Sequence, residues 1–325
     1  MVLKISFTFR APKHVSKQMA GLAAAMLLSP VLWAQTPTAT SARAEQARTF
    51  QPSTPAPVES ISSGLSLEQA PASPGDADIG EQVILRRREK NTPFKLFANV
   101  SGFYTSNAAL TDIHTVNDFF LVAEVGVSYQ TRLATDLYGE VTIRQATFRY
   151  DRFDELDFDS LNAGAGLTYI CRPLWGLALS IRYNFNRLTD GSQHDDFFKN
   201  QTLTLAVQKT FELSKAHYLF AGVAGVIGWS DPVAPQRDEY GPYLGYHLNL
   251  TRTLSAEASY RLAYFDYVRS RGDWNQSLSL TLKWDPTKWL SLSASTSFGY
   301  NQSNHDQFDY NVFNGGVGIA ASISF

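Results

Sequence analysis

The sequence predicts an all-β protein whose antiparallel strands close into an up-and-down transmembrane β-barrel of about 12 strands, preceded by a disordered arm. Three observations support this fold class. From residue 94 to residue 325, apolar and polar residues alternate with the period of two that a strand with two different faces requires. Brief and longer connections alternate between these segments. Aromatic and aliphatic side chains fill one face, and the other face is often too polar for a dry core.

Twelve segments have the alternating pattern and are the expected strands. They are 95–105, 118–130, 136–149, 158–171, 177–187, 198–209, 217–229, 240–250, 255–267, 274–284, 289–300 and 311–325. A strand with its connection averages about nineteen residues, which is enough for a tilted membrane-crossing strand and a turn. An even strand count is typical of bacterial transmembrane barrels.

The connections differ at the two ends of the predicted barrel. After even-numbered strands they are brief, as in TRLAT, RPLWG and DPTK, and after odd-numbered strands they are longer and acidic or amide-rich, as in SNAALTDIHTVN and NQSNHDQFD. Outer-membrane barrels combine short periplasmic turns with long extracellular loops in the same way. We therefore expect the brief connections on the periplasmic side.

The segment 274–284 distinguishes a membrane barrel from a soluble sandwich, whose strands also have one apolar face. Its apolar face carries an aromatic residue at each end: Trp274, Leu278, Leu280, Leu282 and Trp284. Ten residue steps of about 3.3 Å, tilted by about 45°, span roughly 23 Å, close to the height of the apolar band of such barrels. The opposite faces of other strands are polar, as in Ser291, Ser293, Ser295 and Ser297.

Residues 1–34 have the pattern of a secretory signal peptide. A basic leader precedes an apolar core of about ten residues and small residues near Ala34, and this core is too short for a transmembrane helix. Cleavage after Ala34 removes four of the 28 basic residues and none of the 30 acidic ones, which leaves a formal charge of −6. Such a charge gives no support to a nucleic-acid partner.

Residues 35–93 are expected to form a disordered periplasmic arm. Their first part, 35–76, is rich in Pro, Ala, Ser and Thr and lacks periodicity, and a basic cluster at 86–88 is read as a solvated charge run. The predicted organisation is therefore a signal peptide (1–34), an arm (35–93) and a β-barrel (94–325). The arm is a candidate site for periplasmic partners.

The final run, GGVGIAASISF, resembles the C-terminal strand of bacterial outer-membrane proteins. The matching residues are Val317, Ile319, Ala321, Ile323 and the terminal aromatic Phe325, with Ala321 smaller than the bulky residue usual there. The resemblance implies that the barrel-assembly machinery reads this strand before it closes against the first one, and that lipid of the outer membrane surrounds the barrel. The segment GFYTSNAAL and the length of the chain also resemble the β-barrel porin families of Gram-negative bacteria.

Strand parity assigns a set of charged residues of mixed sign to the lumen. They are Glu124, Glu140, Arg144, Arg182, Glu257, Arg261 and Lys283. Two interpretations stay open: the charges form a constriction that selects solutes, with the three arginines facing the glutamates across it, or they pair and neutralise one another in a closed lumen.

The function expected from this pattern is passage of small hydrophilic solutes through an outer-membrane barrel. The alternative is a closed structural or secretion-associated barrel, for instance in export of a surface polysaccharide, and an outer-membrane hydrolase ranks third. His114, His194 and His305 lie in predicted loops beside acids, but no spacing joins them into a catalytic or metal site. Cys171 is the single cysteine and is read as a packed apolar group. We thus expect no enzyme activity, cofactor or metal.

Overall fold

The computed structural model describes residues 43–48, 92–112, 115–214 and 216–325. Twelve strands make up almost all of this part. They are β1 (Phe94–Thr105), β2 (Asp118–Ala134), β3 (Leu137–Tyr150), β4 (Phe158–Cys171), β5 (Leu177–Asp190), β6 (Asp196–Ser214), β7 (His217–Asp231), β8 (Arg237–Asn249), β9 (Leu254–Tyr267), β10 (Gly272–Trp284), β11 (Leu290–Ser303) and β12 (Tyr310–Ser324). Among the described residues, no helix has both the length and the apolar character needed to cross a membrane.

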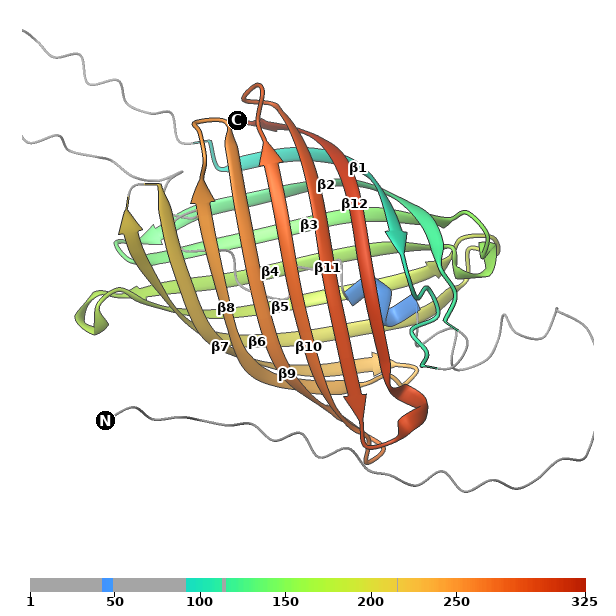
Figure 1. The fold of residues 1–325 in the computed structure, drawn as a ribbon. Coiled ribbons are helices and arrows are strands. Elements are labelled where there is room, and N and C mark those ends of the chain that lie inside the picture. Colours follow the sequence, from blue (N-terminus) through green and yellow to red (C-terminus); the bar gives the residue numbers. More distant parts are fainter. Residues whose placement is uncertain (1–42, 49–91, 113–114, 215) are drawn as a thin grey trace, which may run out of the picture.

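Each strand pairs antiparallel with its neighbours in the chain, and β1 pairs with β12, so the sheet is a closed barrel (Figure 1). The predicted fold class and all twelve strands are confirmed. Strand β4 has the predicted bounds, and the other strands differ from prediction mainly at their ends. Successive side chains of a strand point to opposite sides of the sheet. The alternation of apolar and polar residues therefore places apolar side chains on the outer face of the barrel and polar side chains in the lumen.

The seam between β1 and β12 joins the two ends of the barrel chain. The register runs from Lys95 opposite Ser324 to Thr105 opposite Asn314. Beyond the Lys95–Ser324 end of this register, the backbone N–H of Phe325 donates to the carbonyl of Phe94 at 2.9 Å, and the two rings stack with their centroids 5.7 Å apart. The ring of Phe94 also contacts the ring of Tyr129 on β2, with the two centroids 4.7 Å apart. The last residue therefore extends the closing seam beyond the strand itself.

The outer surface of the barrel is apolar. Alternate residues of β10, from Trp274 through Leu278, Leu280 and Leu282 to Trp284, are exposed, as the sequence predicted. The exposed residues of β12 include Val317, Ile319 and Ile323, on the same outward parity as Phe325. So much exposed apolar area around a whole barrel is suited to lipid rather than water.

Several of the predicted long connections are shorter than expected, because the strands continue into them. β5 reaches Asp190 and β6 starts at Asp196, so that the connection with His194 is a tight hairpin, and β8 starts at Arg237 within the predicted loop SDPVAPQRDE. Backbone pairing continues here because an antiparallel hairpin satisfies its own hydrogen bonds. The extension brings Arg237 and Glu239 into a strand, on its lumen-facing parity.

Residues 43–48 also differ from the sequence prediction. They form a short helix inside the barrel (blue in Figure 1), within the stretch expected to be a disordered periplasmic arm. The physical reason is burial: both alanines of this helix, Ala44 and Ala47, pack into an apolar cluster of the barrel wall. The signal peptide and the other residues of the predicted arm up to residue 91 lie outside the described residues.

The closing seam leads to a prediction about assembly. Replacing Phe325 by Ala removes the stacked ring beside Phe94, and aromatic pairs contribute about 1 kcal/mol beyond their buried area. We expect less folded barrel in the membrane fraction, measured from the difference in gel mobility between unheated and boiled samples. Val233→Ala, at an exposed position of the β7–β8 connection, is the control. An unchanged amount of folded Phe325→Ala protein would contradict the prediction.

Candidate functional site

The lumen of the barrel is the candidate site. At the end formed by the connections after odd-numbered strands, the wall carries a cluster of buried aromatic and aliphatic side chains. Members that pack with the two helix alanines are Phe120, Phe148, Phe158, Leu188 and Phe198. Phe148 and Phe158 stack with centroids 4.3 Å apart. The small side chains of the helix allow its backbone to approach this wall closely, so the helix narrows the lumen at this end.

Charged groups fix both ends of the helix. At its start, the Nη1 atom of Arg43 donates to Asp190 of β5 at 2.9 Å, and the guanidinium lies 4.0 Å from the ring centroid of Phe197. At its end, Arg48 donates to the carbonyl oxygen of Pro235 at 3.0 Å and to Glu45 at 2.8 Å. The helix is thus tied to the wall at β5 and at the β7–β8 connection.

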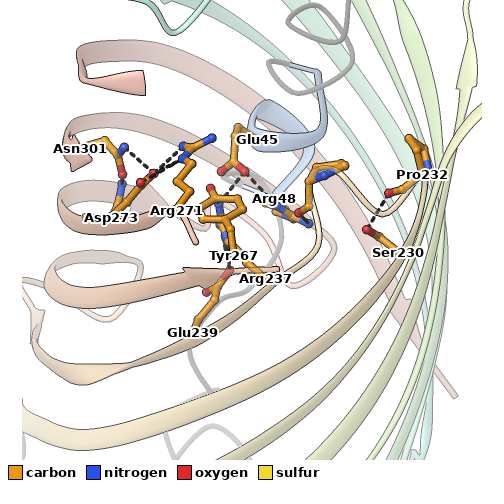
Figure 2. A network of polar contacts seen from close by, with 12 residues as sticks. Glu45, Arg48, Ser230, Pro232, Arg237, Glu239, Tyr267, Arg271, Asp273 and Asn301 are labelled. Carbon is orange, nitrogen blue, oxygen red and sulfur yellow. Dashed lines mark hydrogen bonds and ion pairs between the residues drawn. The ribbon is translucent and has the colours of Figure 1, made fainter. Parts of the chain in front are cut away.

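Between these ends, Glu45 joins a chain of alternating charges (Figure 2). Its Oε1 atom accepts from Arg48 and, at 2.5 Å, from Arg237. Arg237 also contacts Glu239 at 2.8 Å, and Glu239 accepts from Arg261 of β9 at 2.6 Å. We call Arg48, Glu45, Arg237, Glu239 and Arg261 the lumen charge chain. It begins in the helix and ends on the wall.

The environment of Glu45 keeps it charged. Burial raises the pKa of this carboxyl group, but the positive charges of Arg237 and Arg48 outweigh burial and hold the pKa below its ordinary value. A lowered pKa means that the charged form stabilises the seated helix. This contribution is complete above the ordinary carboxyl pKa and is lost as the pH falls through the lowered value.

A second set of polar side chains, which includes Tyr267 of β9 and Asp273 of β10, holds Arg237 in position. Arg237 donates to the Tyr267 hydroxyl at 2.7 Å, and the guanidinium of Arg271 lies 4.1 Å from the ring centroid of Tyr267. Arg271 pairs with the fully buried Asp273, which also accepts from Asn301 at 2.9 Å (Figure 2). These bonds hold Arg237 where it meets the helix.

Four of the seven predicted lumen residues form ion pairs within one side of the wall. Arg144 lies 3.9 Å from Glu124 on the neighbouring strand, and Arg182 of β5 lies 2.6 Å from Glu140 of β3. The second pair reaches across β4, where Gly166 is the register partner of both residues. A glycine there leaves the space above the backbone open, so the two long side chains can meet.

The other three residues have partners that the sequence analysis did not assign. Arg261 pairs with Glu239, while Glu257 lies 3.3 Å from the ring nitrogen of His247 and Lys283 lies 3.0 Å from Asp285. Arg261 and Glu257 lie on the same strand, β9, and the register between β8 and β9 places Glu257 opposite His247. Within the described residues, no group of three or more His, Cys, Asp and Glu side chains is arranged to hold a metal ion.

Next to the helix, the lumen contains a cavity of about 360 Å³. Its lining includes the whole lumen charge chain and hydroxyl and amide side chains from β5, β6 and β9 to β12. The sequence analysis found Arg261 but missed Glu45, Arg48, Arg237 and Glu239. The available signal was the run RAEQAR at 43–48, in which two small residues alternate with charges at helical spacing.

The chain resembles known proteins in its fold and not in its sequence. No protein-family model matches the chain, and no curated protein sequence matches it. Among solved structures, an outer membrane channel from Pseudomonas putida F1 has 9% sequence identity and a TM-score of 0.51, and covers 78% of this chain and 100% of its own.

Two further similar structures are porins. An anion-selective porin from Comamonas acidovorans has 10% identity and a TM-score of 0.39, covering 71% of this chain and 98% of its own. The KdgM porin in complex with disordered oligogalacturonate has 6% identity and a TM-score of 0.41, covering 70% of this chain and 99% of its own. The fold is that of an outer-membrane β-barrel, and at these identities the likeness concerns the fold alone.

The anchoring of the helix can be tested with a cysteine probe. Ala47, which is 3% exposed, is replaced by Cys in a Cys171→Ser background. In this protein we expect slow maleimide labelling, and adding Glu45→Gln should accelerate it by about tenfold or more, since a carboxylate between two arginines is lost. Glu155→Gln, an exposed acid of the β3–β4 connection, is the matched control. Equal labelling rates in the two variants would show that Glu45 does not hold the helix.

Proposed function

We propose that this protein is an outer-membrane channel through which small hydrophilic solutes pass. The observation that carries the proposal is a polar lumen with a cavity of about 360 Å³, enclosed by a barrel with an apolar outer surface. A barrel that serves only as a scaffold has no need of hydroxyl and amide side chains around an interior space, because buried polar groups without partners are costly. The proposed activity is passage rather than catalysis.

The helix 43–48 sets the width of the proposed path. It lies in the lumen against one side of the wall. Ion pairs and hydrogen bonds attach it there, and these non-covalent contacts are reversible. In this proposal the path beside the helix is narrow, and it widens when the helix leaves its seat. The final strand, from Val317 to Phe325, is proposed as the element that the barrel-assembly machinery recognises.

The helix also favours a second candidate function, a closed barrel that works with partners in secretion or as a structural element. In that case the helix is a permanent seal and its attachments to β5 and β8 serve stability. The two functions differ in one measurable property, since only a channel conducts ions.

Conductance of the purified barrel in planar bilayers tests the proposal. We expect small single-channel conductance for the unmodified protein, and larger conductance for Glu45→Gln, because loosening the helix opens the lumen at its narrow end. Glu155→Gln should leave conductance unchanged. Absence of conductance in all three proteins would refute the channel and leave the closed barrel.

Ion preference tests whether the paired wall charges border the path. Arg182→Ala leaves Glu140 without its partner at 2.6 Å and should shift the reversal potential in a salt gradient toward cations. Glu257→Ala should shift it toward anions. Both shifts should shrink at high salt because screening shortens the range of the charges. Arg172→Ala, at a turn outside the lumen, is the control. Reversal potentials that stay fixed in both lumen variants would exclude these residues from the path.

A further inference from the structure

The cavity beside the helix has one more positive than negative group. Its charged lining consists of three arginines and two glutamates, all of them members of the lumen charge chain. Each glutamate lies between two arginines, so the chain ends in a guanidinium on both sides: Arg48 in the helix and Arg261 on β9. Among the described residues, the lining therefore carries a net positive charge that no carboxylate of the cavity offsets.

Arg261 has hydrogen-bonding capacity left over. Among the described residues, its side chain donates one hydrogen bond, from Nη2 to Glu239 at 2.6 Å. A guanidinium has five N–H donors in a planar fork that matches a carboxylate. The side chain is mostly buried and lines the cavity, so its remaining donors can be satisfied by an anionic group in that space.

Hydroxyl groups line the cavity along β9, β10 and β11, beginning beside Arg261. Register places Ser277 opposite Arg261, Ser279 opposite Ser259 and Ser295 opposite Thr281, and all five hydroxyl residues line the cavity. Ser259 and Ser279 bond to each other at 2.6 Å. Within the described part of the chain, the side chains of Ser277, Ser295 and Thr281 make no hydrogen bond. Their hydroxyl groups can therefore donate to and accept from a ligand in the cavity.

A buried amide adds an acceptor without a partner. Asn314 of β12 lines the same cavity and is 5% exposed. Its Nδ2 atom donates to Ser297 at 3.4 Å, but its Oδ1 atom has no partner among the described residues. A buried acceptor of this kind calls for a donor from a ligand or water, because burying it unpaired is costly.

From these groups we propose that the cavity binds a small polyhydroxylated carboxylate, such as a sugar acid. The carboxylate pairs with the free donors of Arg261, and the hydroxyls of the ligand bond with the serine and threonine side chains and with Asn314. A neutral polyol lacks the partner for Arg261, and a simple anion leaves the hydroxyl groups unpaired. The inference deepens the proposed channel function by naming the class of solute that the path favours.

Ligand-observed NMR on the full mature chain in detergent micelles at low salt tests binding without requiring conductance. The probe is D-gluconate, compared with sorbitol, the neutral polyol of equal chain length, and with acetate. We expect saturation transfer to gluconate that exceeds the transfer to either comparator. Equal transfer to gluconate and sorbitol, or none to gluconate, would overturn the proposal.

Variants locate the site. Arg261→Gln should weaken gluconate binding by about tenfold, the typical effect of losing a charged hydrogen bond, and Arg261→Lys should restore part of it. The double variant Ser277→Ala, Ser295→Ala should weaken binding of gluconate but not of acetate. Ser293→Ala, on the same face of β11 but outside the cavity lining, and Arg172→Gln are the matched controls. Gel mobility of unheated samples confirms that each variant is folded.

Conductance of the same preparations separates this inference from the channel itself. Conductance without gluconate binding overturns the ligand site and leaves the channel. Gluconate binding without conductance supports the ligand site and overturns the channel. Gluconate binding that persists unchanged in Arg261→Gln overturns the assigned site.

Discussion

Closure of the sheet is the constraint on which the rest of the structure depends. In lipid, every backbone N–H and C=O needs a partner within the protein, so a strand assembly must have no free edge. The pairing of β1 with β12 meets this requirement, and Phe94 and Phe325 extend it by backbone bonds and a stacked ring pair. Once the sheet is closed, alternate side chains must point outward to lipid or inward to the lumen, which separates apolar from polar residues.

The lumen in turn must satisfy the charges that closure brings inside. On the side of β2 to β5, Arg144 pairs with Glu124 on the neighbouring strand, and Arg182 pairs with Glu140 across β4. On the other side, Arg237 is surrounded by carboxylates of two different segments, since Glu239 belongs to its own strand and Glu45 to the helix. The helix therefore does more than fill space: it supplies a charge that the wall lacks.

The two sides of the lumen differ in chemistry, and this difference shapes the proposed path. Paired charges cover β2 to β5, whereas hydroxyl groups cover β9 to β11 around one guanidinium with free donors. A solute between these sides meets a hydrogen-bonding wall with a single excess positive charge. Such a wall discriminates by the combination of hydroxyl groups and charge, more finely than by size alone.

The sequence by itself determined the number of strands, the face of each residue and the closing strand, because a period of two is a local property of the chain. It did not determine the helix at 43–48, since the helical spacing of charges in six residues is a weak signal and the helix is stabilised by contact with the wall. Nor did it determine the partners of Arg261 and Glu257. Parity places a side chain in the lumen, but only the register between strands and the closure of the barrel decide which charges meet.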